Sequence, residues 1–109
     1  MTIVGSDMTV VNEINVQRVK EMLNADETIL ILDQRDQQSY QQGHINGAMM
    51  VHDSLIDSLI RKGNKKQSLL IYCYQGNASK DLAELFCNFG FNAFSISGGY
   101  AEWKRVRDC

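Results

Sequence analysis

Two short runs of apolar residues are the strongest pattern in the chain. Residues 28–33 read Thr-Ile-Leu-Ile-Leu-Asp, and residues 68–73 read Ser-Leu-Leu-Ile-Tyr-Cys. Continuous apolar runs of this length are typical of strands buried on both faces of a parallel sheet. Weaker strand segments, short and rich in residues that favour β structure, are 8–11, 48–51 and 93–96. The pattern therefore predicts about five strands.

Segments with the period of a helix lie between these strands. Asn15 caps a predicted helix that starts at residue 16. The apolar residues of this helix recur at i, i+3 and i+7 and are Val16, Val19 and Leu23. Asp53 caps a second predicted helix, which Gly63 ends. The residues of the second helix expected to face inward are Leu55, Ile56, Leu59 and Ile60.

A third predicted helix covers about residues 77–89 and ends at Gly90. Its apolar stripe is expected to consist of Leu82, Leu85, Phe86 and Phe89. A shorter helix is predicted over residues 36–42, closed by Gly43, and residues 98–103 open a final one. Because strand and helix alternate, the chain is predicted to have an α/β fold with a mainly parallel sheet.

The two strongest strands end on residues with chemically active side chains, Asp33 and Cys73. In open parallel sheets, ligands bind outside the carboxyl ends of the strands, where the strand order reverses. If the two strands are parallel, both residues lie at one edge of the sheet. That edge is where a functional site is expected.

The segment after Cys73 predicts an anion-stabilising loop. A short loop with Gly76 at its centre leads directly into a helix. The backbone N–H groups of such a loop, together with a helix N-terminus, favour a thiolate or a bound oxyanion and lower the pKa of a cysteine from its usual value of about 8.5. The pattern alone also fits a small apolar cysteine that simply ends a buried strand.

The chain has three cysteines. Because this number is small and odd, a disulfide framework is not expected. Free thiols in a reducing cytoplasm are therefore expected. Cys87 lies on a predicted helix beside the apolar stripe, four residues after Ala83, which predicts a packed, inert thiol. Cys109 is the last residue and is expected to be frayed.

Length and charge narrow the classes of function. The 109 residues, 44% hydrophobic and 22% charged, predict one soluble globular domain over 1–109. Eleven Lys and Arg against thirteen Asp and Glu give a net charge of −2, which argues against nucleic acid or an anionic membrane as the main partner. No apolar run approaches the roughly 20 residues of a membrane span, and the first eight residues lack the features of a signal peptide. A cytoplasmic location is expected.

Competing motifs for chemistry are absent from the sequence. It has no C-x-x-C pair, and the two histidines, His44 and His52, have no ligand spacing with the cysteines, so no metal site is expected. Glycine-rich phosphate loops are missing as well. Cysteine-based phosphatases carry Cys, five residues and then an Arg that binds the phosphoryl oxygens. Here Ser79 stands at that position, which disfavours a phosphatase.

Taken together, these motifs resemble the rhodanese family of sulfurtransferases, in particular its short single-domain bacterial members of the GlpE type, the thiosulfate sulfurtransferases. Residues 32–35 (Leu-Asp-Gln-Arg) and 43–48 (Gly-His-Ile-Asn-Gly-Ala) resemble the first motif of the family. Residues 73–78 (Cys-Tyr-Gln-Gly-Asn-Ala) resemble its six-residue active loop, and 98–103 (Gly-Gly-Tyr-Ala-Glu-Trp) its C-terminal motif. The similarity covers about residues 8–107, in order and with compatible spacing.

The resemblance implies a five-stranded, mainly parallel sheet with helices on both faces and a core over about residues 8–107. It implies that the Cys73 thiolate takes the outer sulfur of thiosulfate or a similar small anionic donor, releases sulfite and becomes a persulfide. Cyanide or a thiol, including that of a thioredoxin-like protein, then accepts the sulfur, and no cofactor is needed. The implied substrate-binding residues are those of the loop: Tyr74, Gln75, Gly76, Asn77, Ala78 and Ser79.

Other positions within these motifs are expected to have supporting roles. Asp33 and Arg35 support the loop as a structural ion pair, and His44 braces a turn. Tyr100 and Trp103 pack the last helix on the sheet. Lys80 is the cation nearest the loop in sequence, and it is equally expected to be a solvated surface lysine.

Three positions depart from the pattern of the family. Gln75 stands where relatives often carry a basic residue or His, and Ala78 stands where they carry a hydroxyl. Gln75 supplies no charge and Ala78 donates no bond to sulfur, so weak thiosulfate binding is expected. Asn46 replaces the usual Pro and loosens a turn. A non-catalytic rhodanese-like binding module and a cysteine-based phosphatase or arsenate reductase remain as alternative functions.

Overall fold

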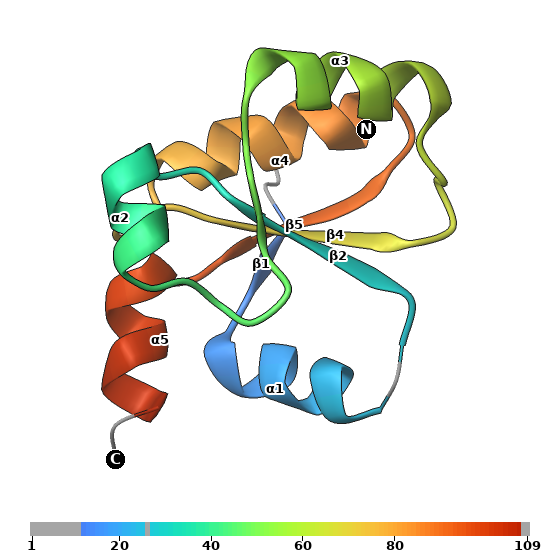
Figure 1. Cartoon of the computed structure of the whole chain (residues 1–109). Coiled ribbons are helices and arrows are strands. Elements are labelled where there is room, and N and C mark those ends of the chain that lie inside the picture. The colour runs from blue at the N-terminus through green and yellow to red at the C-terminus, as the bar shows by residue number, and fades with distance from the viewer. Residues whose placement is uncertain (1–11, 26, 108–109) are drawn as a thin grey trace, which may run out of the picture.

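The computed structural model describes residues 12–25 and 27–107, and its strands form one parallel sheet (Figure 1). The strands are β1 (Glu13–Ile14), β2 (Ile29–Asp33), β3 (Met49–Met50), β4 (Ser68–Tyr72) and β5 (Asn92–Ile96). Their order is β1-β5-β4-β2-β3, and every neighbouring pair is parallel. The α/β fold with five parallel strands is therefore confirmed.

Four of the five predicted strand segments are found in the sheet. The fifth, residues 8–11, lies outside the described residues. The edge strand beside β5 is β1 (Glu13–Ile14), in which Glu13 pairs with Ser95 of β5. The sequence pattern missed β1 because a two-residue edge strand with one exposed Glu has too little apolar surface to stand out.

Helices cover both faces of the sheet (Figure 1). They are α1 (Val16–Asn24), α2 (Gln37–Gln42), α3 (Asp53–Lys62), α4 (Ala78–Asn88) and α5 (Gly99–Arg107). Apolar residues of α1 and α5 pack on one face of the sheet, and those of α3 and α4 pack on the other. None of the described helices is long and apolar enough to cross a membrane.

Side-chain caps set where several helices begin. The Asn15 side chain accepts a hydrogen bond from the Arg18 N–H at 2.8 Å, as the sequence predicts for the start of α1. The predicted cap of α3 is wrong by one residue. His52 is the cap, since its Nδ1 accepts from the Leu55 N–H at 3.2 Å, and Asp53 is the first helical residue. Gly63 ends α3 as predicted.

Three residues predicted to be buried are exposed at the helix surface. On α1, the buried stripe continues from Val19 to Met22, so it drifts away from Leu23, which is 38% exposed. On α4, Leu85 is 37% exposed. Phe89 is 46% exposed because the helix ends there and the chain turns, so that Phe91 packs edge-on against Phe86 instead, with ring centroids 5.5 Å apart.

The order of the strands creates one switch point. After β2 the chain crosses through α2 to β3, and after β4 it crosses through α4 to β5 on the opposite side. β2 and β4 are neighbours, and their register pairs Asp33 with Tyr72, the residue before Cys73. The Gln34 N–H donates to the Tyr72 carbonyl oxygen at 2.7 Å, which extends the pairing of β2 and β4 by one residue. Asp33 and Cys73 therefore lie at the same carboxyl edge of the sheet.

Two phenylalanines of the α4 region provide a test of this packing. Phe86 is fully buried, so Phe86→Ala is expected to lower the free energy of unfolding by about 3–5 kcal/mol. Phe89→Ala is expected to change it by about 0.5 kcal/mol or less. Urea denaturation followed by circular dichroism measures both, with Phe86→Leu in reserve if the alanine variant does not fold. Equal costs for the two alanine variants would contradict the packing.

Candidate active site

The Cys73 sulfur lies in a cradle of hydrogen-bond donors. Cys73 is 4% exposed, and its Sγ accepts from the N–H of Gly76 at 3.2 Å and from the N–H of Ser79 at 3.4 Å. The Ser79 hydroxyl also lies 3.4 Å from Sγ. Because Ser79 is in the first turn of α4 and Asn77 makes no side-chain cap, the sulfur takes the place of the missing cap. The arrangement favours the thiolate form.

The hydrogen bonds outweigh the burial of the thiol. Burial alone raises the pKa of Cys73, since it disfavours a charged sulfur. The Ser79 hydroxyl and backbone N–H groups of the loop act in the opposite direction, and the net effect lowers the pKa of Cys73 below its ordinary value. The N-terminal end of α4 adds its dipole to the same effect.

A second helix N-terminus fixes the loop from the other side. The first N–H groups of α5 donate to loop carbonyls, from Tyr100 to Cys73 at 2.8 Å and from Ala101 to Tyr74 at 3.1 Å. The two chain segments meet so closely that a Cβ on Gly99 would lie 2.5 Å from the Cys73 carbonyl oxygen. Gly76 has a φ of 93°, and a Cβ there would lie 2.9 Å from the Gly98 nitrogen. Both contacts require glycine.

The six predicted loop residues divide into two groups. Gly76 and Ser79 are buried and contact the sulfur. The exposed members are Tyr74, Gln75, Asn77 and Ala78, and with Cys73 and Gln34 they line a cavity of about 300 Å³. Sequence reasoning missed Gln34, whose side-chain Oε1 is buried and has no hydrogen-bond partner among the described residues. Its position between Asp33 and Arg35, directly after a buried strand, is the signal that could have found it.

Ser79 supplies the hydroxyl that Ala78 lacks. Its Oγ lies between the Cys73 sulfur and the Ser95 Oγ, which is 2.8 Å away. Ser79 and Ser95 are both fully buried. Ser95 lies on β5, and its contact with Ser79 depends on how the chain folds, so the sequence did not predict it.

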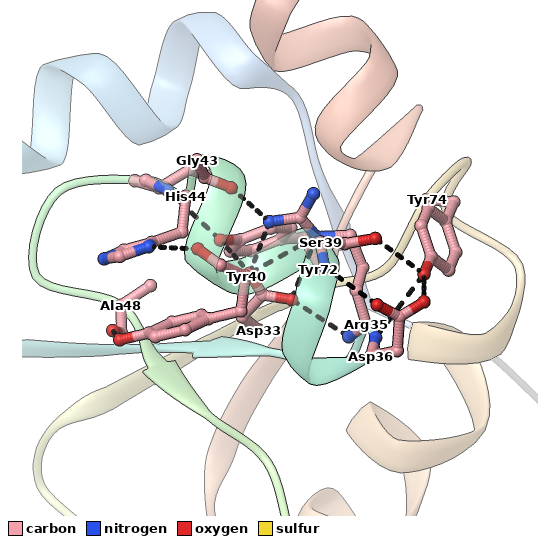
Figure 2. Close-up of polar contacts among 11 residues, drawn as sticks. Asp33, Arg35, Asp36, Ser39, Tyr40, Gly43, His44, Ala48, Tyr72 and Tyr74 are labelled. Carbon is pink, nitrogen blue, oxygen red and sulfur yellow. Dashed lines mark hydrogen bonds and ion pairs between the residues drawn. The ribbon is translucent and has the colours of Figure 1, made fainter.

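A buried ion pair lies beside the loop, at the end of β2 (Figure 2). The Arg35 Nε donates to Asp33 Oδ1 at 3.0 Å, and its Nη2 donates to Oδ2 at 2.7 Å. The Tyr72 hydroxyl donates to the same Oδ2 at 2.6 Å and accepts from the Ile45 N–H at 3.1 Å. Burial, followed by this bond to Asp33, raises the pKa of Tyr72, which therefore stays a neutral donor.

Arg35 also connects this edge to the rest of the site. Its Nη2 donates to the Gly43 carbonyl oxygen at 2.6 Å, and its guanidinium carbon lies 3.9 Å from the centroid of the Tyr100 ring. His44 follows Gly43, stacks on Tyr40 and contacts the Tyr40 carbonyl oxygen through Nδ1 at 2.7 Å. His44 therefore braces this turn.

Tyr74 joins the loop to α2. Its hydroxyl donates to the Asp36 carboxylate and lies 3.0 Å from the Ser39 Oγ (Figure 2). The hydrogen bond from Tyr74, and then that from the Ser39 N–H, lowers the pKa of Asp36. The α2 N-terminus and the loop are thus held together by a carboxylate that stays charged.

Three further candidates, Cys87, Trp103 and Lys80, do not line the cavity at Cys73. The half-buried Cys87 packs against the core, and its thiol lies 3.4 Å from the Ala93 carbonyl oxygen. Trp103 packs half-buried against the opposite face, and Lys80 is half-buried. Cys109 lies outside the described residues. Within 12–25 and 27–107, no three His, Cys, Asp or Glu side chains form a group that could hold a metal ion.

Comparison with known proteins shows the family of the chain. The family model described as a rhodanese-like domain matches residues 15–106. The chain belongs to the rhodanese-like family. A rhodanese-like domain protein from Staphylococcus aureus is 26% identical with a TM-score of 0.73, covering 84% of this chain and 90% of that one. The Alr3790 protein from Anabaena sp. is 28% identical with a TM-score of 0.73, and the coverages are 85% and 76%.

One neighbour of this rhodanese-like domain carries a different description. A protein of unknown function from Rhodopseudomonas palustris, described as a possible tyrosine phosphatase, has a TM-score of 0.77. It is 17% identical, and the match covers 89% of this chain and 82% of that one. At this identity the likeness shows a shared fold alone.

The cradle of the rhodanese-like domain predicts how the thiol titrates. Ser79→Ala removes the hydroxyl next to Sγ, so it is expected to raise the pKa of Cys73. The rate of iodoacetamide alkylation at Cys73, followed by mass spectrometry against pH, should therefore rise at higher pH than in the wild type. Ser54→Ala, at an exposed serine of α3, is the matched control. An unchanged profile in Ser79→Ala would contradict the role of the hydroxyl.

Proposed function

We propose that this protein is a sulfurtransferase that carries a sulfane sulfur as a persulfide on Cys73. The observation that supports this most strongly is the cradle around Sγ, in which two N–H groups and the Ser79 hydroxyl face one buried sulfur. Such donors stabilise a negative charge that moves between sulfur atoms during transfer. A thiol that served only to pack the core would need none of them.

In the proposed first half-reaction, the Cys73 thiolate attacks the outer sulfur of thiosulfate or a similar anionic donor. The S–S bond of the donor breaks, its electron pair leaves with sulfite, and the enzyme keeps a persulfide. Splitting the transfer into two displacements lowers each barrier. The Gly76 and Ser79 donors, which hold the thiolate, remain in place for the persulfide.

In the proposed second half-reaction, an acceptor attacks the outer sulfur of the persulfide. The electron pair of the S–S bond returns to the Cys73 sulfur, and the thiolate is regenerated. Cyanide leaves as thiocyanate, and a thiol, including that of a thioredoxin-like protein, leaves as a persulfide. No oxidant is consumed, which suits the reducing cytoplasm that we propose as its location.

The buried ion pair acts as a positioning element in this scheme. Asp33 and Arg35 touch no sulfur, but Arg35 stacks on Tyr100, whose N–H holds the Cys73 carbonyl. Rigid support of this kind keeps the donors within hydrogen-bond distance of the sulfur throughout both half-reactions. The exposed loop residues Tyr74, Gln75, Asn77 and Ala78 surround the cavity where the donor would bind.

A phosphatase or arsenate reductase is the less favoured function. Ser79, the residue at the position of the phosphatase arginine, is fully buried and bonded to Ser95. It leaves a phosphoryl group without a fork of N–H donors. A non-catalytic binding module is disfavoured as well, because binding alone gives no reason for a thiol with a lowered pKa.

Mass spectrometry tests the persulfide directly. After incubation with thiosulfate, the wild-type protein is expected to gain about 32 mass units, and cyanide should remove them as thiocyanate. Cys73→Ala should gain nothing, whereas Cys87→Ser, which keeps the nucleophile, should behave as the wild type. An equal gain in Cys73→Ala, or no gain from any sulfane donor in the wild type, would refute the function. Hydrolysis of an aryl phosphate that depends on Cys73 would favour the phosphatase.

The uncharged loop predicts weak binding of thiosulfate. Gln75 is exposed at the cavity, so Gln75→Arg adds a positive charge there without disturbing the buried donors. The KM for thiosulfate is expected to fall by about threefold to tenfold, because one exposed charge pair strengthens binding by about that factor. Steady-state thiocyanate formation measures it, and the gain should shrink at high salt. A KM that does not change would show that charge at this position is irrelevant.

A further inference from the structure

Gln34 lies beside Cys73 at the carboxyl edge of the sheet. The register of β2 and β4 pairs Asp33 with Tyr72, and the hydrogen bond from the Gln34 N–H to Tyr72 extends that pairing. Gln34 and Cys73 are therefore the next neighbours along the two strands, which in a sheet lie about 4.8 Å apart. Both residues line the cavity of about 300 Å³.

The side chains of Gln34 and Cys73 lie on the same face of the sheet. Side chains alternate between the two faces along a strand, so Gln34 follows the face of Leu32, and Cys73 follows the face of Ile71. Leu32 and Ile71 belong to one buried cluster, on the face that α3 and α4 cover. The Gln34 carboxamide is thus placed next to the sulfur by the sheet itself, with no contribution from the loop.

The carboxamide of Gln34 has no hydrogen-bond partner within residues 12–25 and 27–107. Its Oε1 is buried there without a donor. A buried polar group without a partner destabilises the folded state, whereas an apolar side chain of the same length does not. A polar residue at such a position, in the wall of a cavity, indicates a role in binding a ligand.

The amino end of this amide is the end that a ligand can reach. Oε1 is enclosed, whereas Nε2 is not among the enclosed atoms without a partner. Because Gln34 lines the cavity, Nε2 is its donor toward a ligand there. Two other amides line the same cavity, those of Gln75 and Asn77, but both are exposed. The half-buried Gln34 has less conformational freedom to lose on binding.

A persulfide on Cys73 needs a donor that the resting thiolate does not use. Gly76 and Ser79 donate to Sγ itself. The outer sulfur of a persulfide would lie about 2 Å beyond Sγ, which is the length of an S–S bond. That sulfur carries negative charge, and charge-assisted hydrogen bonds are the strong ones. Gln34 makes no hydrogen bond to Sγ in the structure, so its donor is free for the outer sulfur.

We infer that Gln34 is a binding residue for the transferred sulfur, which its Nε2 holds through a hydrogen bond both in the bound donor and in the Cys73 persulfide. The inference rests on the proposed sulfurtransferase function and adds a residue that contacts the moving atom. As the thiolate attacks thiosulfate, the S–S bond of the donor breaks and its electron pair leaves with sulfite. The transferred sulfur, now bonded to Cys73, keeps its hydrogen bond to Nε2.

Gln34→Met tests the hydrogen bond, because it removes both polar ends of the amide and keeps the length of the side chain. The rate constant for persulfide formation from thiosulfate, followed by mass spectrometry, is expected to fall by about tenfold. The rate of iodoacetamide alkylation against pH should stay the same, since Gln34 does not contact the resting thiolate. The free energy of unfolding in urea should be unchanged or higher, because a buried unpaired oxygen is lost.

Gln67→Met is the matched control. Gln67 is also half-buried, but it directly precedes β4, at the end of that strand opposite to Cys73, and it does not line the cavity. It should keep the wild-type rate. The inference is overturned if Gln34→Met forms the persulfide at the wild-type rate. Equal slowing in Gln67→Met, or a shifted alkylation profile in Gln34→Met, which indicates a structural role, would also overturn it.

A binding measurement separates this inference from the proposed function. Thiosulfate is titrated into ¹⁵N-labelled Cys73→Ala, in which no transfer can occur, and the dissociation constant is measured from backbone amide shifts. Adding Gln34→Met to this variant is expected to raise the dissociation constant by about tenfold, and adding Gln67→Met should leave it unchanged. Equal binding with and without Gln34→Met refutes the role of Gln34. Absence of a persulfide in the wild type refutes the proposed function instead.

Discussion

The buried carboxylate of Asp33 is the constraint on which this edge of the molecule depends. A buried charge is costly unless it is fully paired, so the chain must bring donors to it from several elements. Arg35 comes from the same segment, whereas Tyr72 comes from β4. Tyr72 directly precedes the candidate nucleophile Cys73, so the network reaches the start of the Cys73 loop. Through Arg35 the network also contacts Gly43 and the Tyr100 ring of α5.

Much of this fold could be predicted because its clearest signals come from residues that are adjacent in the sequence. The apolar runs of β2 and β4 and the polar cap of α1 are properties of neighbouring residues. The contact between Ser79 and Ser95 is not, since it depends on where α4 packs against β5. The same holds for Tyr72 and Asp33, which are 39 residues apart. The exposure of Phe89 depends on where the helix ends, and periodicity alone does not reveal that point.

The candidate site shows a similar division between what residue types imply and what geometry adds. Cysteine before a short glycine-containing loop predicts stabilisation of a thiolate, and the backbone donors around Sγ agree with that. Two further features arise only from the fold. The Ser79 hydroxyl compensates for Ala78, and positive charges from α5 gather beside a loop that itself carries none. Net charge is therefore a poor guide to the local field at this edge.

The close approach between the Cys73 loop and the start of α5 has a consequence for how the loop can vary. Gly76 and Gly99 leave no space for a side chain, and Ser79 is enclosed, so these positions preserve the sulfur cradle. The side chains of Gln75, Asn77 and Ala78 are exposed and make no hydrogen bond to the sulfur, whereas the exposed Tyr74 also ties the loop to α2. Interleaving fixed and free positions within six residues lets selection, or an engineer, change which molecules the loop recognises while its reactive atom keeps the same surroundings.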